Sequence, residues 1–451
     1  MKTFTGFMCW LLFVSFLFSM GRKPEWVKQR PIDNSYYIGI AMSFKEYNPD
    51  DYQEKAKEAA LRDMASQIKI SIQSTNIRKI VEANSEISES FTSYMQTALQ
   101  ADLEGYDLVD TWEDEKEYWV YFRLHKAKYE AIRRAKIEKA MSLAVDFLTR
   151  GDQFKSQGKE ADAIQFYFKG LEAIEKYATE ALQTEYNGKE IYLANELIAK
   201  LQQSMAGIKF RPNNPELQIK QGNIPKQPIL IDVVYESSMG NETPVPNFPV
   251  KSSFTAGTLD TLVVSSTNGT ASIKITSINN YKEAKQIKCT ASLSKLFGSD
   301  ITSPILKGVI STLTIPETTI YLRLLAATAF ITGTEKNLGS PVSVLHIIPA
   351  LKEAMVSEGF QFVDTPQKAD FIIKIEANTV QGAQVSGLHT AFASVDVSVL
   401  DAKSYKELHR EALHDIKGIQ LDYRKAGLKA LEQAGKDVVA KVLPQLIKNL
   451  Q

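Results

Sequence analysis

The chain has 451 residues, of which 53 are basic and 53 acidic, so its formal net charge at pH 7 is zero. This balance gives no indication of nucleic acid or of an acidic ligand as the partner. The length suffices for about three or four domains at ~100–150 residues each, and the hydrophobic content of 44% is that of an ordinary globular protein.

Residues 1–21 have the pattern of a secretory signal peptide. The apolar run at residues 7–20 is shorter than the roughly 20 residues that span a bilayer, and it matches the apolar core of such a signal. Ser19 and Gly21 place small residues at the positions that signal cleavage requires. We therefore expect export with cleavage before Arg22; an uncleaved anchor is the alternative.

The two cysteines predict neither a disulfide nor a lipid anchor. Cys9 lies in the apolar run and would leave with the signal, so Cys289 has no intramolecular partner. Cys9 follows Phe7 and Met8 near the start of that run, whereas lipid attachment needs small residues before a cysteine at its end. With no histidine nearby in the sequence, Cys289 is interpreted as a core thiol.

Residues 22–128 are predicted to form an α+β domain. An apolar run at residues 36–42 indicates a strand, and residues 68–73 alternate in a way that predicts a half-buried strand. Residues 85–103 indicate an amphipathic helix, and the runs 106–112 and 117–124 flank an acidic turn, which predicts a hairpin. Between the first two strands, apolar residues recur at helical spacing on one face: Ala56, Ala60, Met64 and Ala65. The alanines among them predict a helix that lies close on a sheet.

A resemblance to a known family follows from this domain. Its proline–tryptophan start, Tyr-x-x-Gly strand, Ala-x-x-Met-Ala step and Tyr118-Trp119-Val120-Tyr121 run resemble the Lpp-twenty lipoprotein domain, with related domains in flagellar assembly protein T. The resemblance implies an exported, envelope-associated domain that is not known as an enzyme. The chain lacks the family's lipid-attachment motif, which puts membrane attachment in doubt but not export.

Residues 129–206 are predicted to be helical, with a break at Gly151-Asp152 and a turn at residues 157–159. Small and aromatic residues at Ala144, Gly151, Tyr167 and neighbouring positions resemble one tetratricopeptide helix pair. A single pair cannot bury its own face, because such repeats need neighbours. A plain helical packing layer is favoured over a peptide-binding groove.

Residues 207–227 are rich in proline and glycine and are predicted to be a linker. Residues 228–316 are predicted to form a β-sandwich, with strands at 229–235, 259–264, 271–275 and 286–291. Asn268-Gly269 indicates a tight hairpin. The segment is similar to bacterial immunoglobulin-like and carboxypeptidase-regulatory-like modules, which are common as spacers in secreted proteins.

Residues 317–451 are predicted to form a second α+β domain. A strand run at 320–331 precedes a helix at 342–358, which Pro341 starts and Gly359 stops. Strands at 360–364, 371–377, 392–400 and 405–416 lead to a helix at 422–450 that is kinked or ends near Pro444. This order resembles the N-terminal domain of TolB and domains of flagellar assembly protein T and the curli secretion-channel protein; the likeness concerns topology.

The sequence predicts no catalytic, cofactor-binding or metal-binding residue, because it contains no zinc, phosphate-loop or nucleophile-elbow motif. His409 and His414 are interpreted as surface residues, and the acidic run at 110–117 as a solvated turn. Half of the aromatic residues in the hairpin can be buried by alternation. We take the candidate contact aromatics to be Trp26, Trp112, Trp119 and Tyr121.

The predicted protein is a multi-domain α+β protein: an α+β domain, a tetratricopeptide-like helical layer, a β-sandwich and a second α+β domain. The first hypothesis is an exported, non-enzymatic scaffold or assembly factor of the periplasm or outer membrane, whose partners are envelope proteins such as an outer-membrane complex. The alternative is a periplasmic or surface module that binds a glycan or peptide. A third hypothesis is an enzyme whose site is assembled only in the folded chain.

Overall fold

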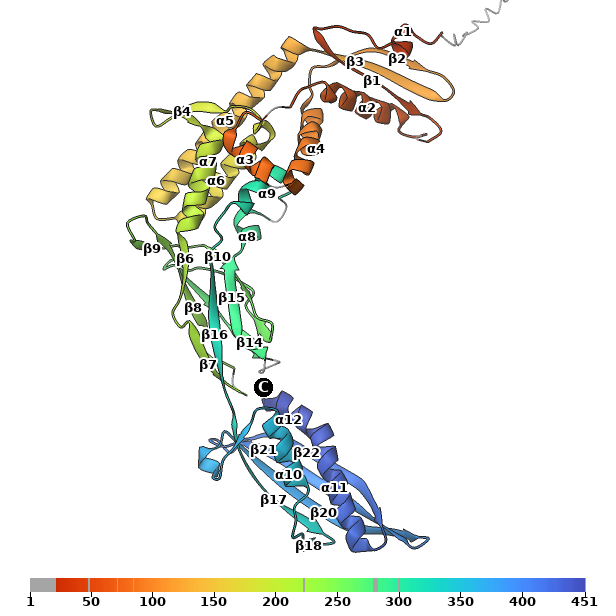
Figure 1. Ribbon diagram of the computed structural model, residues 1–451, viewed down its shortest axis with the longest axis vertical. Helices are drawn as coiled ribbons and strands as arrows, with labels where there is room; N and C mark the ends of the chain where they lie inside the picture. Colours follow the sequence, from red (N-terminus) through yellow and green to blue (C-terminus); the bar gives the residue numbers. More distant parts are fainter. Residues whose placement is uncertain are drawn as a thin grey trace, which may run out of the picture. The chain divides into compact units, whose positions relative to one another are not determined.

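The computed structural model describes residues 22–47, 49–70, 72–83, 85–221, 224–278, 283–298 and 301–450. The predicted signal peptide at residues 1–21, which includes Cys9, lies outside the described residues. The chain is a mixed α and β protein with several separate sheets, as expected for a multi-domain α+β protein (Figure 1). It divides into two compact units: Met1–Gln157 with Asp162–Met205 and Phe297–Thr314, and Gly158–Ala161 with Ala206–Leu296 and Ile315–Gln451.

The first unit begins with an antiparallel sheet whose order is β1-β3-β2. Its elements are α1 (Glu25–Lys28), β1 (Tyr36–Phe44), α2 (Tyr52–Ser66), β2 (Asp107–Glu113) and β3 (Glu117–His125). The predicted apolar face of α2 is confirmed, because Ala56, Ala60, Met64 and Ala65 are all buried. The helix lies so close to β1 that a Cβ atom on Gly39 would sit 2.2 Å from the carbonyl oxygen of Ala60.

The predicted strand at residues 68–73 is wrong. None of the described residues in this segment is in a strand, and the chain passes into α3 (Thr75–Ala83) and α4 (Ser85–Asp102). Alternation specifies a strand only where another strand can pair with it. The backbone N–H of Gln73 bonds instead to the carbonyl of Thr179, at 2.7 Å. The predicted hairpin and the helix at 85–103 are confirmed.

The helical layer contains α5 (Lys126–Ser156), α6 (Glu160–Ile174), η1 (Glu175–Tyr177), the hairpin β4 (Gln183–Tyr186) and β5 (Lys189–Tyr192), and α7 (Leu193–Gly207). The predicted break at Gly151-Asp152 is wrong, because α5 runs through it. A Cβ on Gly151 would lie 2.4 Å from the ring of Tyr167, so this glycine permits close helix packing. The turn comes at Gly158, whose φ is +73°.

One segment of the predicted β-sandwich is helical and belongs to the first unit. Helix α9 (Pro304–Ser311) contacts α3 and α4. The hydroxyl of Ser303 accepts a hydrogen bond from the N–H of Leu306, and Pro304 occupies the first turn, which is a favourable start for a helix. A short helix, α8 (Leu293–Phe297), precedes it.

The β region of the second unit contains two larger sheets and a small one. One sheet has the order β12-β10-β15-β16-β7, another β13-β8-β6 with β9 beside β8, and β11 pairs with β14. The strands are β6 (Ile208–Pro212), β7 (Glu216–Lys220), β8 (Ile229–Glu236), β9 (Glu242–Pro244), β10 (Pro249–Ser253), β11 (Gly257–Leu259), β12 (Leu262–Val264), β13 (Thr270–Ile273), β14 (Ile275–Ile278), β15 (Gln286–Ala291) and β16 (Glu317–Leu325).

Three predictions for this region are corrected. The predicted linker contains β6 and β7, whose Phe210 and Ile219 are buried. The turn at Gly269 exists, with φ of +78°, but the strands on either side of it belong to different sheets. The strand run at 320–331 is two strands, and its first half is β16, which pairs with β15 and β7.

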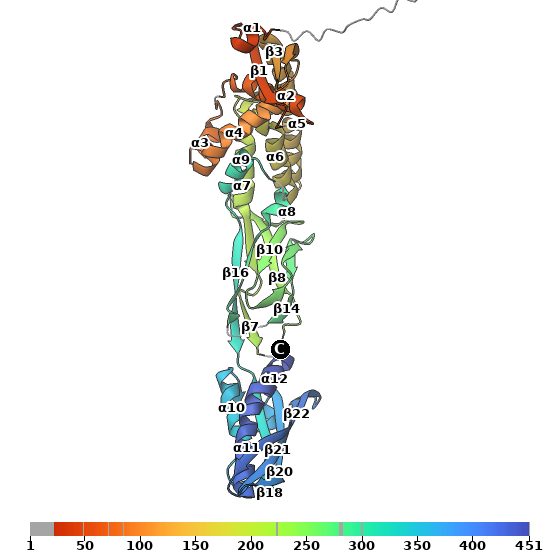
Figure 2. The same ribbon diagram turned by 90° about the vertical axis from the view of Figure 1, so that its right-hand side faces the viewer.

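The C-terminal domain has a sheet of order β18-β17-β20-β21-β22, with β19 beside β17. Its strands are β17 (Thr328–Asn337), β18 (Ser340–Pro341), β19 (Gln361–Phe362), β20 (Phe371–Val385), β21 (Leu388–Asp401) and β22 (Glu407–Gln420). Helices α10 (Ile347–Ser357) and α11 (Tyr423–Asp437) lie side by side on one face of this sheet (Figures 1 and 2).

The helix boundaries of this domain differ in part from the prediction. Helix α10 begins only at Ile347, not at residue 342, and the predicted strand at 360–364 is reduced to Gln361–Phe362. The final helix passes through a π-helical turn, Val438–Val442, into α12 (Leu443–Leu450). The helical pattern therefore changes just before Pro444, as a proline requires. Among the described residues, no helix combines the length and apolar character needed to cross a membrane.

Candidate interaction surface

The four aromatic residues singled out from the sequence lie together on one face of the first sheet. Along β3, Val120, Phe122 and Leu124 are buried in the core shared with α2. Successive side chains of a strand point to opposite faces, so Trp119 and Tyr121 lie on the face away from α2. Both of these side chains are half-buried.

The segment that carries Trp26 contacts this face. The indole Nε1 of Trp26 donates a hydrogen bond to Oδ2 of Asp110 at 2.8 Å. Its ring centroid lies 5.7 Å from that of Tyr121. Asp110 and Tyr121 are cross-strand partners, so Trp26 binds both members of one pair. This anchors α1 to the sheet.

The second pair of aromatic residues is Trp112 and Trp119, which are also cross-strand partners. The Nζ atom of Lys23 lies 5.0 Å from the ring centroid of Trp112 and 5.3 Å from that of Trp119. The same atom pairs with Glu117 at 2.9 Å. Hydrogen bonds from Trp119 and Lys23 lower the pKa of Glu117, so this carboxylate stays charged and holds both groups in place.

Two further aromatic residues extend this surface and were missed from the sequence. Met42 is the register partner of Trp119, so Phe44, two residues further along β1, lies on the same face. Its ring centroid is 5.8 Å from that of Tyr47. Phe44 is 41% exposed and Tyr47 74% exposed. We call the set Trp26, Phe44, Tyr47, Trp112, Trp119 and Tyr121 the aromatic face.

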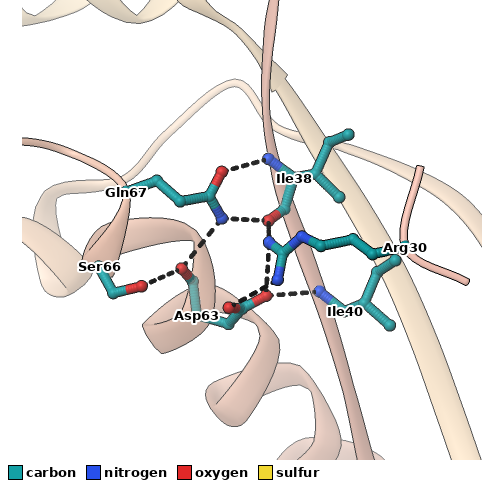
Figure 3. A network of polar contacts seen from close by, with 6 residues as sticks. All are labelled: Arg30, Ile38, Ile40, Asp63, Ser66 and Gln67. Carbon is teal, nitrogen blue, oxygen red and sulfur yellow. Dashed lines mark hydrogen bonds and ion pairs between the residues drawn. The ribbon is translucent and has the colours of Figure 1, made fainter. Parts of the chain in front are cut away.

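The free edge of β1 is covered by side chains rather than by another strand (Figure 3). Asp63 accepts a hydrogen bond from the N–H of Ile40 at 3.0 Å and pairs with Arg30 at 2.9 Å. One helical turn later, the Gln67 amide accepts from the N–H of Ile38 at 3.2 Å and donates to its carbonyl. Arg30 also donates to that carbonyl. The edge groups of Ile38 and the N–H of Ile40 are therefore satisfied within the chain.

The opposite edge of the sheet, β2, is protected in another way. A register shift between Leu108 and Asp110 interrupts its pairing with β3, and acidic residues stand at Asp107, Asp110 and Glu113. Bulges and charges both oppose pairing with a further strand. With both edges protected, the aromatic face is the better candidate for contact with a partner.

The other residues considered from the sequence do not form a site. His414 is exposed as predicted, but the side chain of His409 is only 9% exposed and lies 3.6 Å from Glu411. Cys289 is buried as predicted for a core thiol, and burial raises the pKa of the Cys289 thiol. Across the described residues, no group of three or more His, Cys, Asp and Glu side chains is placed to hold a metal ion.

A polar cavity of about 280 Å³ lies in the first unit, next to Tyr129 and Arg133. The guanidinium of Arg133 donates to Glu180 at 2.8 Å, so its charge is balanced there. Burial raises the pKa of Tyr129 to about 12, which keeps the hydroxyl protonated at neutral pH. A tyrosine hydroxyl with a raised pKa is a poor general base.

Comparison with known proteins gives partial likenesses. No family model matches the chain, and no curated protein matches it. Similar solved structures include a lipoprotein from Neisseria meningitidis (14% identity, 27% of this chain and 99% of that chain, TM-score 0.19). A second example is a minor lipoprotein from Acinetobacter baumannii (12% identity, 27% of this chain and 93% of that chain, TM-score 0.20). A third is a candidate lipoprotein from Caulobacter crescentus (18% identity, 27% of this chain and 88% of that chain, TM-score 0.20). Each is a domain-sized protein that matches about a quarter of this chain.

Proposed function

We propose that this protein is an exported, non-enzymatic scaffold or assembly factor of the cell envelope that acts through protein–protein contacts. The pattern of residues 1–21 supports export. The aromatic face is the observation that carries the proposed mode of action. It presents tryptophan and tyrosine rings, the residue types that dominate the binding energy of protein interfaces.

The internal contacts of the aromatic face suit it to binding. Trp26, Trp112 and Trp119 are each held by hydrogen bonds, by ring contacts or by Lys23. Rings that are already ordered lose little conformational entropy when a partner covers them. The more exposed Phe44 and Tyr47 supply apolar surface that a partner can bury.

The first test concerns export. The native protein is isolated from its own host, its cell fraction is determined and its intact mass is measured. We expect a chain that begins at Arg22 in the periplasmic or outer-membrane fraction. A protein that resides in the cytoplasm would contradict the proposal, and a mass that retains residues 1–21 would indicate a tethered form.

The second test concerns the aromatic face. A photo-crosslinking phenylalanine analogue replaces Tyr47, and as a matched control Tyr321, which is 60% exposed on β16. We expect one defined envelope protein to be crosslinked from position 47 and not from 321. Equal crosslinking from both positions would argue against the aromatic face. Retention on purified cell-wall fragments above that of an unrelated exported protein would favour the glycan-binding alternative.

A further inference from the structure

A cluster of exposed aliphatic side chains lies at one end of the C-terminal sheet. Val385 and Leu388 face each other across the turn that joins β20 and β21. In the neighbouring strand, Ile419 pairs with Thr390, two residues beyond Leu388. We call this cluster the apolar tip; its members are exposed by between 43% and 69%: Val380, Val385, Leu388, Ile419 and Leu421.

The strand register places most of the apolar tip on the face of the sheet that no helix covers. Ala391 pairs with Gly418, and a Cβ on Gly418 would lie 2.2 Å from the carbonyl oxygen of Ala426 in α11. Because successive side chains of a strand point to opposite faces, Leu388 and Thr390 point away from α11. Their cross-strand partners, Val385 and Ile419, lie on the same face. Further along the same face the residues are polar, with Ser394 two positions beyond Phe392.

The hairpin is rigidly built at this end. Ser386 and Gly387 both have positive φ, 53° and 78°, which is the conformation of a two-residue type I′ turn. The hydroxyl of Tyr423 donates to the carbonyl of Gly382 at 3.2 Å, and its ring lies 4.4 Å from that of His389. The exposed aliphatic side chains therefore project from a two-residue turn whose hairpin is braced against α11 by Tyr423.

The charged residues at positions 415–425, beside the apolar tip, are three basic and two acidic, an excess of one positive charge. Residues 378–395 contain no Asp, Glu, Lys or Arg. Lys417 pairs with Phe392 on the uncovered face, and Arg424 and Lys425 stand in the first turn of α11. Cations at a helix N-terminus oppose the helix macrodipole. Of the two acidic residues, Asp422 pairs with Lys425 at 3.4 Å, which balances both charges, and Asp415 lies two residues before Lys417.

We propose that the apolar tip docks on the surface of an anionic bilayer. Aliphatic side chains at the outermost turn of a rigid hairpin enter the boundary between head groups and acyl chains, while nearby basic side chains attract the anionic head groups. A second copy of the chain is the other occupant, which the test below distinguishes from a bilayer. The contact requires only the C-terminal domain and is independent of the aromatic face.

The test is sedimentation of the chain that starts at Arg22 with vesicles of equal parts phosphatidylglycerol and phosphatidylcholine. We expect binding that weakens in phosphatidylcholine alone. The double variant Val385→Asp with Leu388→Asp should lose at least about ten-fold in affinity, and Lys417→Gln about five-fold. Val356→Asp is the matched control, because Val356 is 55% exposed on α10 of the same domain, and it should bind like the unchanged chain.

Three results would overturn the proposal: equal binding of the double variant and the unchanged chain, equal loss in Val356→Asp, or no binding to the anionic vesicles. Analytical ultracentrifugation of the same variants tests the alternative occupant, which is a second copy of the chain. A dimer that the double variant abolishes, without vesicle binding, would assign the apolar tip to a second copy. Thermal unfolding by circular dichroism should be unchanged in the double variant, which checks that the hairpin still folds.

Discussion

Single polar residues hold distant parts of the helical layer together, and Asp152 is the clearest case. Its carboxylate accepts hydrogen bonds from the hydroxyls of Tyr167 and Tyr186, at 2.7 and 2.9 Å, and pairs with Lys200 at 2.8 Å. Burial alone would raise the pKa of Asp152, but Lys200 and the two hydroxyls hold it below its usual value. The sequence interpretation took this position for a helix break, because the roles of its partners appear only in the folded chain.

We expect Asp152→Asn to lower the free energy of unfolding by about 1–3 kcal/mol at neutral pH, because one acceptor becomes a donor facing Lys200. The folded pKa of Asp152 lies below the unfolded value of roughly 3.9, so its contribution is present above that pH and is lost as pH falls through the folded pKa. Urea unfolding at neutral and acidic pH should show the difference shrinking with acid.

Asp146→Asn is the control for this prediction, since Asp146 is 48% exposed and pairs with Arg150 of the same helix. An exposed pair of this kind contributes little, so its effect should be small. A loss in Asp152→Asn that is the same at every pH would contradict the proposed role of its charge.

Among the elements, the helices and strands with a clear period and a local partner could be predicted from the sequence, whereas those defined by distant partners could not. The β2–β3 hairpin and α2 agree with the prediction because their pairing and burial are settled by near neighbours. The sequence at residues 68–73 alternates like a strand, but the described residues of this segment pair with no strand. Helix α9 was missed because α3 and α4, which it packs against, are far away in the sequence.

The edge of β1 gives a prediction at this scale. Asp63→Ala with Gln67→Ala frees the edge N–H groups of Ile38 and Ile40. We expect a loss of about 1–3 kcal/mol in the free energy of unfolding, together with concentration-dependent association measured by sedimentation velocity. The control, Glu54→Ala with Glu58→Ala on the same helix, should remain monodisperse to the same degree as the unchanged chain.

The start of α10 gives a second prediction. The buried carboxylate of Glu335 accepts from the N–H groups of His346, Ile347 and Ile348, at 2.7, 2.9 and 3.0 Å. Glu335→Ala leaves these groups without an acceptor and should cost about 3 kcal/mol or more, since each bond to a charged group contributes about 1.5–3 kcal/mol. Chemical denaturation should show this loss. The control is Glu376→Ala, on the exposed side of β20, which should leave the free energy of unfolding nearly unchanged.

At the scale of the whole molecule, the C-terminal domain has a core of its own. Its cluster of buried residues runs from Ala327 to Leu446 and, within the described part of the chain, includes no residue of the other sheets. Strand β16, which ends at Leu325, pairs instead with β15 and β7. The boundary therefore falls at residue 326, and not at 317 as the strand run at 320–331 suggested.

We expect a fragment of residues 326–451 to unfold cooperatively by circular dichroism and to sediment as one species. A fragment of residues 317–451 carries β16 without its partners, and an unpaired strand invites association; it should show a higher apparent mass. An unfolded 326–451 fragment would show that this core depends on the rest of the chain.

The sequence by itself determined the features that depend on neighbours in the chain: the α+β character, the hairpin, the buried face of α2, and the alternation that puts Trp119 and Tyr121 on one face. The tertiary structure decided what depends on distant partners: that Trp26 and Lys23 pack on that face, that Asp63 and Gln67 cover the edge of β1, and that α9 belongs to the first unit. The reason is physical. Periodicity records whether a side chain is buried, but not which distant residue buries it or satisfies its polar groups.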